Sequence, residues 1–493
     1  MESNDERPAL CRDGDSHVNP PSVSAAQTAA SYWPFVVLLI SMTLVAVLIT
    51  IVRMHAFLAL ILAAVVTGLL AARLPGEPAK SHWVQAVELT TTEFGIVAGN
   101  ITLVIALASV IGMCLMESGG ADKVVRRFLA VFGDKRAPFA LLSSSYVLSM
   151  PIFFDTFFML LIPIARALSL RTGRNYALFV MAICCGALVT HGVIAPHPGP
   201  LAMAQNLQID LGLTILAGIL VGVFPVLGSW WVARRINAHM TIPLRETAGI
   251  PLADLEAILA KREEELPSFI SSILPVILPI ALIAAASCLS ACGGKGRFPH
   301  VYPWVEFWGN RNVALFIGAV IAMVVLARQK GYSISRMCEL LGPPFETAGV
   351  IVLITSAGGA FGLMLKNAGV GEAIKAATDG RAVDPLLLAY VVACVIRVAQ
   401  GSATVAMLTT SAIMAPILQS GGVLPYHPVY IFLAIGFGAV ILSWMNDSGF
   451  WVISRMSAFT EKETLKTWTV VSTVISVVGL IATWICAKTL PFV

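Results

Sequence analysis

Two apolar segments, one in each half of the chain, contain residues that do not suit an unbroken membrane helix. The first covers 150–165 and the second covers 400–416, and each is followed by another break, at 191–200 and at 443–449. An interrupted helix exposes backbone polar groups, which the bilayer interior tolerates only where those groups line a protein cavity. Interruptions at matching places in two halves of a chain are typical of the substrate site of a secondary transporter.

Composition places the chain in a membrane. Of its 493 residues, 57% are hydrophobic and only 12% are charged, whereas soluble domains carry about 25% charged residues. The net charge of +4 is small and spread over short loops, so we attribute it to membrane topology and not to nucleic-acid binding. The nine cysteines are scattered without the spacing of metal ligands. We therefore expect a polytopic membrane protein with no metal and no cofactor.

The apolar runs that are long enough to cross a bilayer fall into two units, 34–233 and 268–493. A mixed-charge loop, 234–267, joins the two units, and we expect it on the cytoplasmic side. Residues 1–33 are polar and show no signal-peptide pattern, so we expect a disordered tail there. The predicted crossings are 34–52, 56–72, 94–116, 176–208, 211–233, 268–290, 312–327, 345–365, 428–454 and 467–487, of which 176–208 and 428–454 are broken helices.

Two further apolar stretches, 138–168 and 385–420, are predicted to be re-entrant hairpins. Basic loops flank 138–168 on both sides, so a single crossing would place one of them outside, against the positive-inside rule. A hairpin that enters and leaves on the cytoplasmic face removes this conflict. The predicted fold is all-α, an inverted repeat of two units with five crossings and one hairpin each, and both termini outside. Counting the hairpins as full spans would instead give about 12–14 helices.

Asp155 lies among phenylalanines in the first hairpin. A charge inside the bilayer is costly, so an intramembrane carboxylate is by default a functional residue, and burial favours its protonated form, which suits a proton carrier. The alternative is a structural Asp that caps a half-helix.

Arg397 precedes the turn of the second hairpin, where Ser402 and Thr404 follow. A guanidinium there can clamp a carboxylate, and the half-helix that starts near Ser402 aims backbone N–H groups at the same place. A structural Arg that bonds backbone carbonyls is the alternative.

The two broken helices carry the remaining candidates. His191 and His197 flank a break rich in Pro and Gly, where a neutral imidazole can bond a hydroxyl or relay a proton. Asn446 and Asp447 lie in the second break, either as ligands for substrate hydroxyls or as a cap for the following half-helix. The chain shows no nucleotide-binding loop, nucleophile elbow or metalloprotease motif, so an enzyme is disfavoured.

These motifs resemble the gluconate permease family, the gluconate:proton symporters of the ion-transporter superfamily. The resemblance rests on five stretches: 151–155, 195–200, 401–405, 446–451 and 465–469. It implies re-entrant hairpins, a scaffold with a moving transport domain, a homodimer in the bacterial cytoplasmic membrane, and transport of gluconate or related hydroxy-carboxylates. One departure is Thr156-Phe157 after Asp155, where the family commonly has Val-Gly.

The resulting hypothesis is a symporter of protons with a small hydroxy-carboxylate anion, with gluconate as the leading candidate. The alternative is a sodium-coupled carrier of carboxylates, D-serine or other amino acids on the same fold. The candidate proton carriers are Asp155, His191, His197 and Asp447. The candidate substrate-binding residues are Asp155, Thr156, His197, Gly199, Arg397, Gly401, Ser402, Thr404, Asn446 and Asp447.

Overall fold

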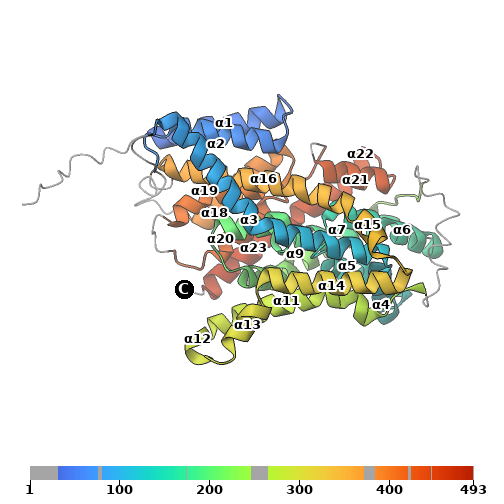
Figure 1. The fold of residues 1–493 in the computed structure, drawn as a ribbon. Coiled ribbons are helices and arrows are strands. Elements are labelled where there is room, and N and C mark those ends of the chain that lie inside the picture. Colours follow the sequence, from blue (N-terminus) through green and yellow to red (C-terminus); the bar gives the residue numbers. More distant parts are fainter. Residues whose placement is uncertain are drawn as a thin grey trace, which may run out of the picture.

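The structure is a computed structural model, and it is all-helical in the part of the chain that it describes (Figure 1). The described residues are 32–75, 80–173, 175–245, 265–370, 373, 384–419, 424–445 and 447–491. Almost all of the predicted N-terminal tail and most of the loop 234–267 lie outside these ranges.

The helices of the first half include a broken helix and one helix, Gly120–Phe132, that was not among the predicted crossings and hairpins. They are α1 (Trp33–Thr50), α2 (Ala56–Leu70), α3 (His82–Glu117), α4 (Gly120–Phe132), η1 (Asp134–Arg136), α5 (Ala137–Leu148), α6 (Phe154–Thr172), α7 (Tyr176–Val193), α8 (Pro198–Asn206) and α9 (Leu211–His239).

The helices of the second half also include a broken helix, together with several short helices. They are α11 (Phe269–Ala291), α12 (Gly294–Arg297), α13 (Tyr302–Trp308), α14 (Arg311–Lys330), α15 (Ile334–Leu340), α16 (Gly342–Asn367), α18 (Pro385–Gln400), α19 (Ala403–Gln419), α20 (Val429–Gly438), α21 (Ser448–Met456), α22 (Glu461–Thr464), η3 (Leu465–Thr469) and α23 (Val470–Thr489).

Matching helices of the two halves make matching contacts. The short helix α5 packs on α7, as α18 packs on α20, and α2 packs on α16, as α14 packs on α3. The two long helices α3 and α16 also lie side by side (Figure 1). The core surrounds the two broken helices, since every described residue of α20 and nearly every residue of α7 is buried. Both helices are apolar on all sides, as a helix surrounded by protein requires.

Seven helices within the described ranges are long and apolar enough to cross a membrane, and α7 with α8 counts as one of them. The predicted spans 34–52, 56–72 and 428–454 correspond to shorter apolar helices. The main difference from the predicted boundaries is α3, which begins at His82 and not at 94. Its first turns carry charged residues that interrupt the hydropathy pattern, but they do not interrupt the helix.

Gly186 gives a stability prediction, because at this position α7 lies directly against the backbone of α5. A Cβ atom at this position would lie 2.7 Å from both Leu142 O and Tyr146 N. We expect Gly186→Ala to destabilise the protein by about 1–3 kcal/mol, because α5 must move away. Thermal unfolding of the purified protein in detergent measures this effect.

The matched control is Gly95→Ala on α3, where an added Cβ would meet nothing within 4 Å. Alanine is the better helix former by about 0.5–1 kcal/mol, so this variant should unfold at the same temperature or higher. Equal losses of stability in the two variants would contradict the packing argument.

Candidate functional site

The loop between α5 and α6, residues 149–153, is held by side chains of the first broken helix. The Ser149 hydroxyl lies 2.6 Å from the Thr190 hydroxyl, and His197 Nε2 lies 2.8 Å from the Ser149 carbonyl oxygen. The helix α6 then begins at Phe154, so Asp155 falls in its first turn. An acidic side chain is favoured there by the positive end of the helix dipole.

The turn between α18 and α19 contains one left-handed residue, Gly401. Gly401 ends α18 with φ +80° and donates its N–H to the Arg397 carbonyl oxygen at 2.9 Å. A residue with a side chain is strained in this conformation, which explains a glycine here. Ser402 Oγ then accepts the Val405 N–H at 3.3 Å, so it caps the start of α19.

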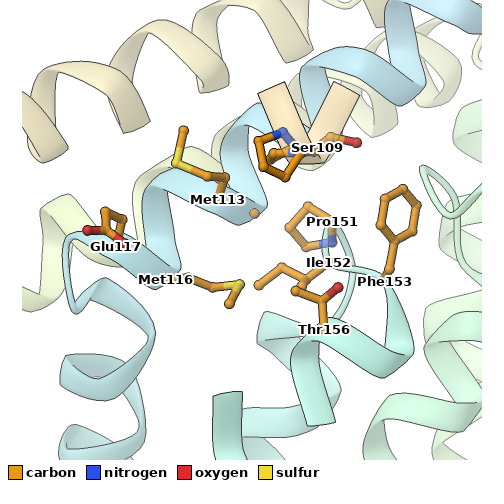
Figure 2. A pocket seen from close by; sticks show the side chains of 11 residues that line it. Ser109, Met113, Met116, Glu117, Pro151, Ile152, Phe153 and Thr156 are labelled. Carbon is orange, nitrogen blue, oxygen red and sulfur yellow. The ribbon is translucent and has the colours of Figure 1, made fainter. Parts of the chain in front are cut away.

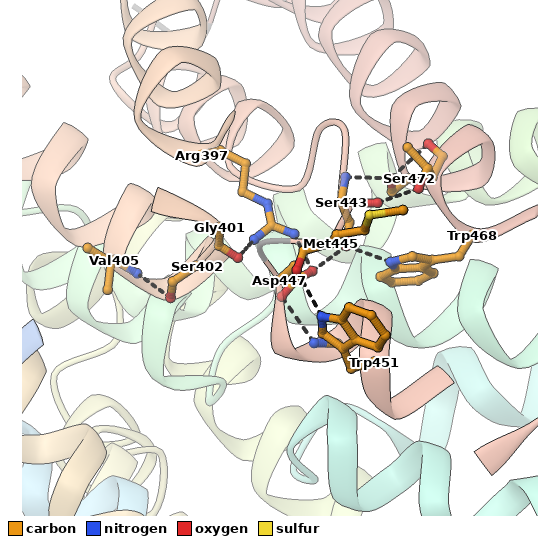
Figure 3. A network of polar contacts seen from close by, with 12 residues as sticks. Arg397, Gly401, Ser402, Val405, Ser443, Met445, Asp447, Trp451, Trp468 and Ser472 are labelled. Atoms are coloured by element: carbon orange, nitrogen blue, oxygen red, sulfur yellow. Dashed lines mark hydrogen bonds and ion pairs between the residues drawn. The ribbon is translucent and has the colours of Figure 1, made fainter. Parts of the chain in front are cut away.

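Asp447 links the break between α20 and α21 to the end of α18. One carboxylate oxygen of Asp447 accepts the Gly449 N–H at 3.1 Å, which caps α21. The other accepts Arg397 Nη2 at 2.5 Å and the Ser443 hydroxyl. Figure 3 shows the Arg397 guanidinium between Gly401 and Asp447. The Arg397 and Asp447 side chains are only 2% and 12% exposed, so this is a buried ion pair.

The starts of four helices meet at one cavity of about 260 Å³, which we call the central cavity. They are α6 with Asp155, α8 with Pro198, α19 with Thr404, and α21 with Gly449. Each helix N-terminus carries about half a positive elementary charge. One first-turn N–H is already bonded in α19 and in α21, and Pro198 and Pro200 of α8 have no N–H, so the helix dipoles contribute more than free N–H groups do. The four helices together therefore create a positive environment made largely of backbone, which is suited to an anion.

The two candidate carboxylates that line the central cavity, Asp155 and Asp447, differ in their hydrogen-bond partners. Asp447 is bonded to Arg397, Ser443 and Gly449, as described above. For Asp155, no hydrogen bond or ion pair of its carboxylate is found with any described residue, although its charge interacts with that of Asp447. Asp155 is thus the carboxylate without a described hydrogen-bond or ion-pair partner, and among the described groups the helix N-termini are what favour its charge.

The two histidines of the first break have different surroundings. His191 lines the central cavity, and its Nδ1 is buried with no hydrogen-bond partner in the described structure. His197 lies behind it, with the ring centroids 5.2 Å apart, and is bonded to the Ser149 carbonyl. His197 therefore holds the loop between α5 and α6, whereas His191 faces the central cavity.

The structure thus brings together most of the predicted site. Of the candidates, Asp155, Thr156, His191, Arg397, Ser402, Thr404 and Asp447 line the central cavity. His197, Gly199 and Gly401 do not line it, and Asn446 lies outside the described residues. A Cβ atom on Gly199 would lie 2.5 Å from Met407 Sδ, so this glycine lets α8 approach α19.

Sequence reasoning missed several residues that line the cavity. Trp468 lies there from the π-helical turn η3, and its Nε1 donates to Ser443 Oγ at 2.5 Å. Its motif supported the resemblance, and a Trp among Thr residues within an apolar run was the available signal. Ile351 of α16 also lines the cavity, and no local pattern marks it among the other apolar residues of that helix.

A second cavity of about 240 Å³ adjoins the central cavity and shares Phe153 and Thr156 with it. Figure 2 shows Met113 and Met116 on one side of this methionine-lined cavity and the loop residues 151–153 on the other. Glu117, at its edge, accepts a hydrogen bond from the Tyr332 hydroxyl at 3.1 Å. Apart from this carboxylate and two hydroxyls, its lining side chains are apolar.

Broken helices that converge on a polar cavity inside a many-helix apolar bundle define a membrane transport protein. Residues 33–489 match the family described as GntP family permease, and the chain belongs to this family. It is therefore a multi-pass transporter of the bacterial inner membrane and not an enzyme.

Curated relatives and a solved structure agree with this assignment. The chain is 32% identical to a gluconate permease of Pseudomonas aeruginosa, over 88% of this chain and 93% of the relative. It is 31% identical to the Gnt-II system L-idonate transporter of Escherichia coli, over 91% and 98% of the two chains. The YdaH transporter of Alcanivorax borkumensis shares the fold, with a TM-score of 0.60 at 14% identity, over 88% of this chain and 98% of that one.

Proposed function

We propose that this protein imports gluconate or a closely related hydroxy-carboxylate together with protons. The observation that carries the proposal is the convergence of four helix N-termini on one cavity, which suits an anion. The two relatives described above are named for gluconate and L-idonate, which are both six-carbon sugar acids with one carboxylate.

The charges in the central cavity support coupling to a proton. Arg397 and Asp447 offset each other, so an ionised Asp155 leaves the side chains with one net negative charge. A substrate carboxylate and the Asp155 carboxylate then compete for the same helix N-termini and repel each other, and this repulsion is strong where water is scarce. Protonation of Asp155 removes the competition. Anion and proton therefore bind together.

Side chains of the cavity suit the hydroxyl groups of such a substrate. His191 Nδ1 is a buried polar atom without a described partner. Ser402 and Thr404 contribute hydroxyls from the start of α19. Leaving a buried polar atom unpaired costs about 1–3 kcal/mol, so a ligand that bonds it gains affinity. We assign hydroxyl recognition to these three residues and proton exchange to Asp155.

The proposal includes the predicted architecture. The two matching sets of helices form an inverted repeat, with the units 34–233 and 268–493, and α5–α6 and α18–α19 are its re-entrant hairpins. The recurring contacts of α5 on α7 and of α18 on α20 support this division. The homodimer, which rests on the family resemblance, and the placement of both termini outside belong to the same proposal.

Uptake of radiolabelled gluconate into proteoliposomes tests the proposed function. We expect an inward proton gradient without sodium to drive accumulation, and a protonophore to abolish it. Liposomes that lack the protein give the background. Accumulation that needs a sodium gradient and ignores the proton gradient would favour the sodium-coupled alternative. Flux that never exceeds equilibrium would contradict coupled transport.

A further inference from the structure

A third cavity, of about 400 Å³, lies at the far ends of two of the helices that start at the central cavity. The helix α8 begins at the central cavity with Pro198 and ends at the third cavity with Gln205 and Asn206. The helix α19 likewise runs from Thr404 at the central cavity to Pro416 at the third. These two helices therefore connect the two cavities.

The long helix α16 passes all three cavities in turn. Pro343 lines the methionine-lined cavity, Ile351 the central cavity and Lys366 the third cavity. At 1.5 Å per residue, Pro343 and Ile351 are roughly 12 Å apart along the helix, and Ile351 and Lys366 are roughly 22 Å apart. The neighbouring α3 passes in the opposite direction, with Asn100 at the third cavity and Glu117 at the methionine-lined one. The cavities thus form a row across the protein.

The third cavity differs from the methionine-lined one in its chemistry. Its polar lining combines the Lys366 ammonium group, the Glu93 carboxylate and amide side chains, so we call it the amide-lined cavity. The charges of Lys366 and Glu93 interact. Asn206 Nδ2 donates to Ser411 Oγ at 2.9 Å, which fixes this amide at the cavity wall. The amides that line the cavity are those of Asn100, Gln205, Asn206 and Gln208.

Such a set of groups matches a polyhydroxylated monocarboxylate. An ammonium group binds a carboxylate, and amides both donate to and accept from hydroxyls. A carboxylate such as Glu93 accepts from hydroxyls as well. Concave sites with a few convergent polar groups are the usual form of small-molecule sites.

We propose that the amide-lined cavity is a second substrate site, which captures the sugar acid before it reaches the central cavity. This inference rests on the proposed function for the identity of the ligand. Lys366 holds the carboxylate, and the amides of Asn100 and Gln205 bond the hydroxyls. The central cavity, in contrast, holds the carboxylate with helix N-termini.

The test separates the two sites by blocking the central cavity. Ala403 lines that cavity, and Ala403→Trp fills it, with Thr404→Phe as a substitute if the first variant does not purify as a monodisperse protein. We expect either block to abolish gluconate uptake while saturable binding of radiolabelled gluconate to the protein in nanodiscs remains. Adding Lys366→Gln should remove this residual binding.

Transport by the unblocked protein gives an independent readout. Loss of a charge-assisted hydrogen bond should raise KM about tenfold in Lys366→Gln, with kcat preserved, because the central cavity is untouched. The matched control is Lys488→Gln. Lys488 is an exposed lysine in the last turn of α23, as Lys366 is in α16, but it lies in none of the three cavities.

Three results would contradict the second site. The blocked protein could lose all gluconate binding, or its residual binding could survive Lys366→Gln. The third such result is residual binding that anionic lipid displaces and unlabelled gluconate does not. Absence of uptake by the wild-type protein would refute the proposed function instead, and binding to the blocked protein would still decide whether the second site exists.

Discussion

Asp155→Asn is expected to abolish proton-driven accumulation of gluconate and to leave its binding intact. Asparagine has the shape of the protonated acid and carries no charge, so the central cavity is permanently in the state that accepts an anion. The substrate then crosses without a proton, and its concentration ratio falls to equilibrium. Proteoliposome uptake measures the ratio, and equilibrium binding measures the affinity.

The pH dependence of gluconate binding tests whether Asp155 takes up the proton. Binding to the wild type should weaken as pH rises, because ionised Asp155 must take up a proton when the anion binds. Binding to Asp155→Asn should not change over the same range.

The matched control for Asp155→Asn is Asp210→Asn at the start of α9, where the side chain accepts the Leu213 N–H at 2.8 Å. Asparagine caps a helix as well as aspartate does, so this variant should transport normally. Accumulation that persists in Asp155→Asn would assign the proton to His191 or Asp447.

Breaking the Arg397–Asp447 pair is expected to give the largest loss of stability. Either Arg397→Ala or Asp447→Ala leaves a buried charge without its partner, which costs about 3–5 kcal/mol. The double variant Arg397→Gln/Asp447→Asn should regain much of this loss, because no unpaired charge remains. It should still fail to transport, because the link between the second hairpin and α21 is weakened. Thermal unfolding in detergent and uptake measure the two effects.

The exposed pair Arg336–Glu339 is the control for this experiment. Its side chains are 55% and 62% exposed and the two groups lie 2.7 Å apart. Exposed pairs contribute about 0–1 kcal/mol, so Arg336→Ala and Glu339→Ala should unfold almost as the wild type does. Single variants of the buried pair that are as stable as these would show that Arg397 and Asp447 do not depend on each other.

The sequence alone predicts the helix breaks that follow from the backbone chemistry of proline and glycine. The breaks at 191–200 and at Gly401 were predictable because proline lacks an N–H group and glycine tolerates left-handed angles. The early start of α3 was not predictable from hydropathy, because Glu88 and its ion pair with Lys80 lie within or beside its first turns. A helix continues through exposed charged residues that end an apolar run.

The site residues were predictable by type, but their contacts with one another were not. A carboxylate or guanidinium in an apolar stretch is conspicuous in any sequence. The bond between Arg397 and Asp447 spans 50 positions and exists only after the two turns meet. The different surroundings of His191 and His197 also depend on packing, because both lie in the same break and have the same chemistry.

The proposed binding of the anion at helix N-termini has an evolutionary consequence. Point substitutions change side chains and leave the peptide dipoles of α6, α8, α19 and α21 in place, so under this proposal selectivity for an acid is robust to sequence drift. Under the same proposal, preference among sugar acids depends on the few side chains assigned to bind hydroxyls, such as Thr404 and His191. The proposal therefore predicts that related permeases diversify among stereoisomeric acids through a handful of substitutions and keep a common charge selectivity.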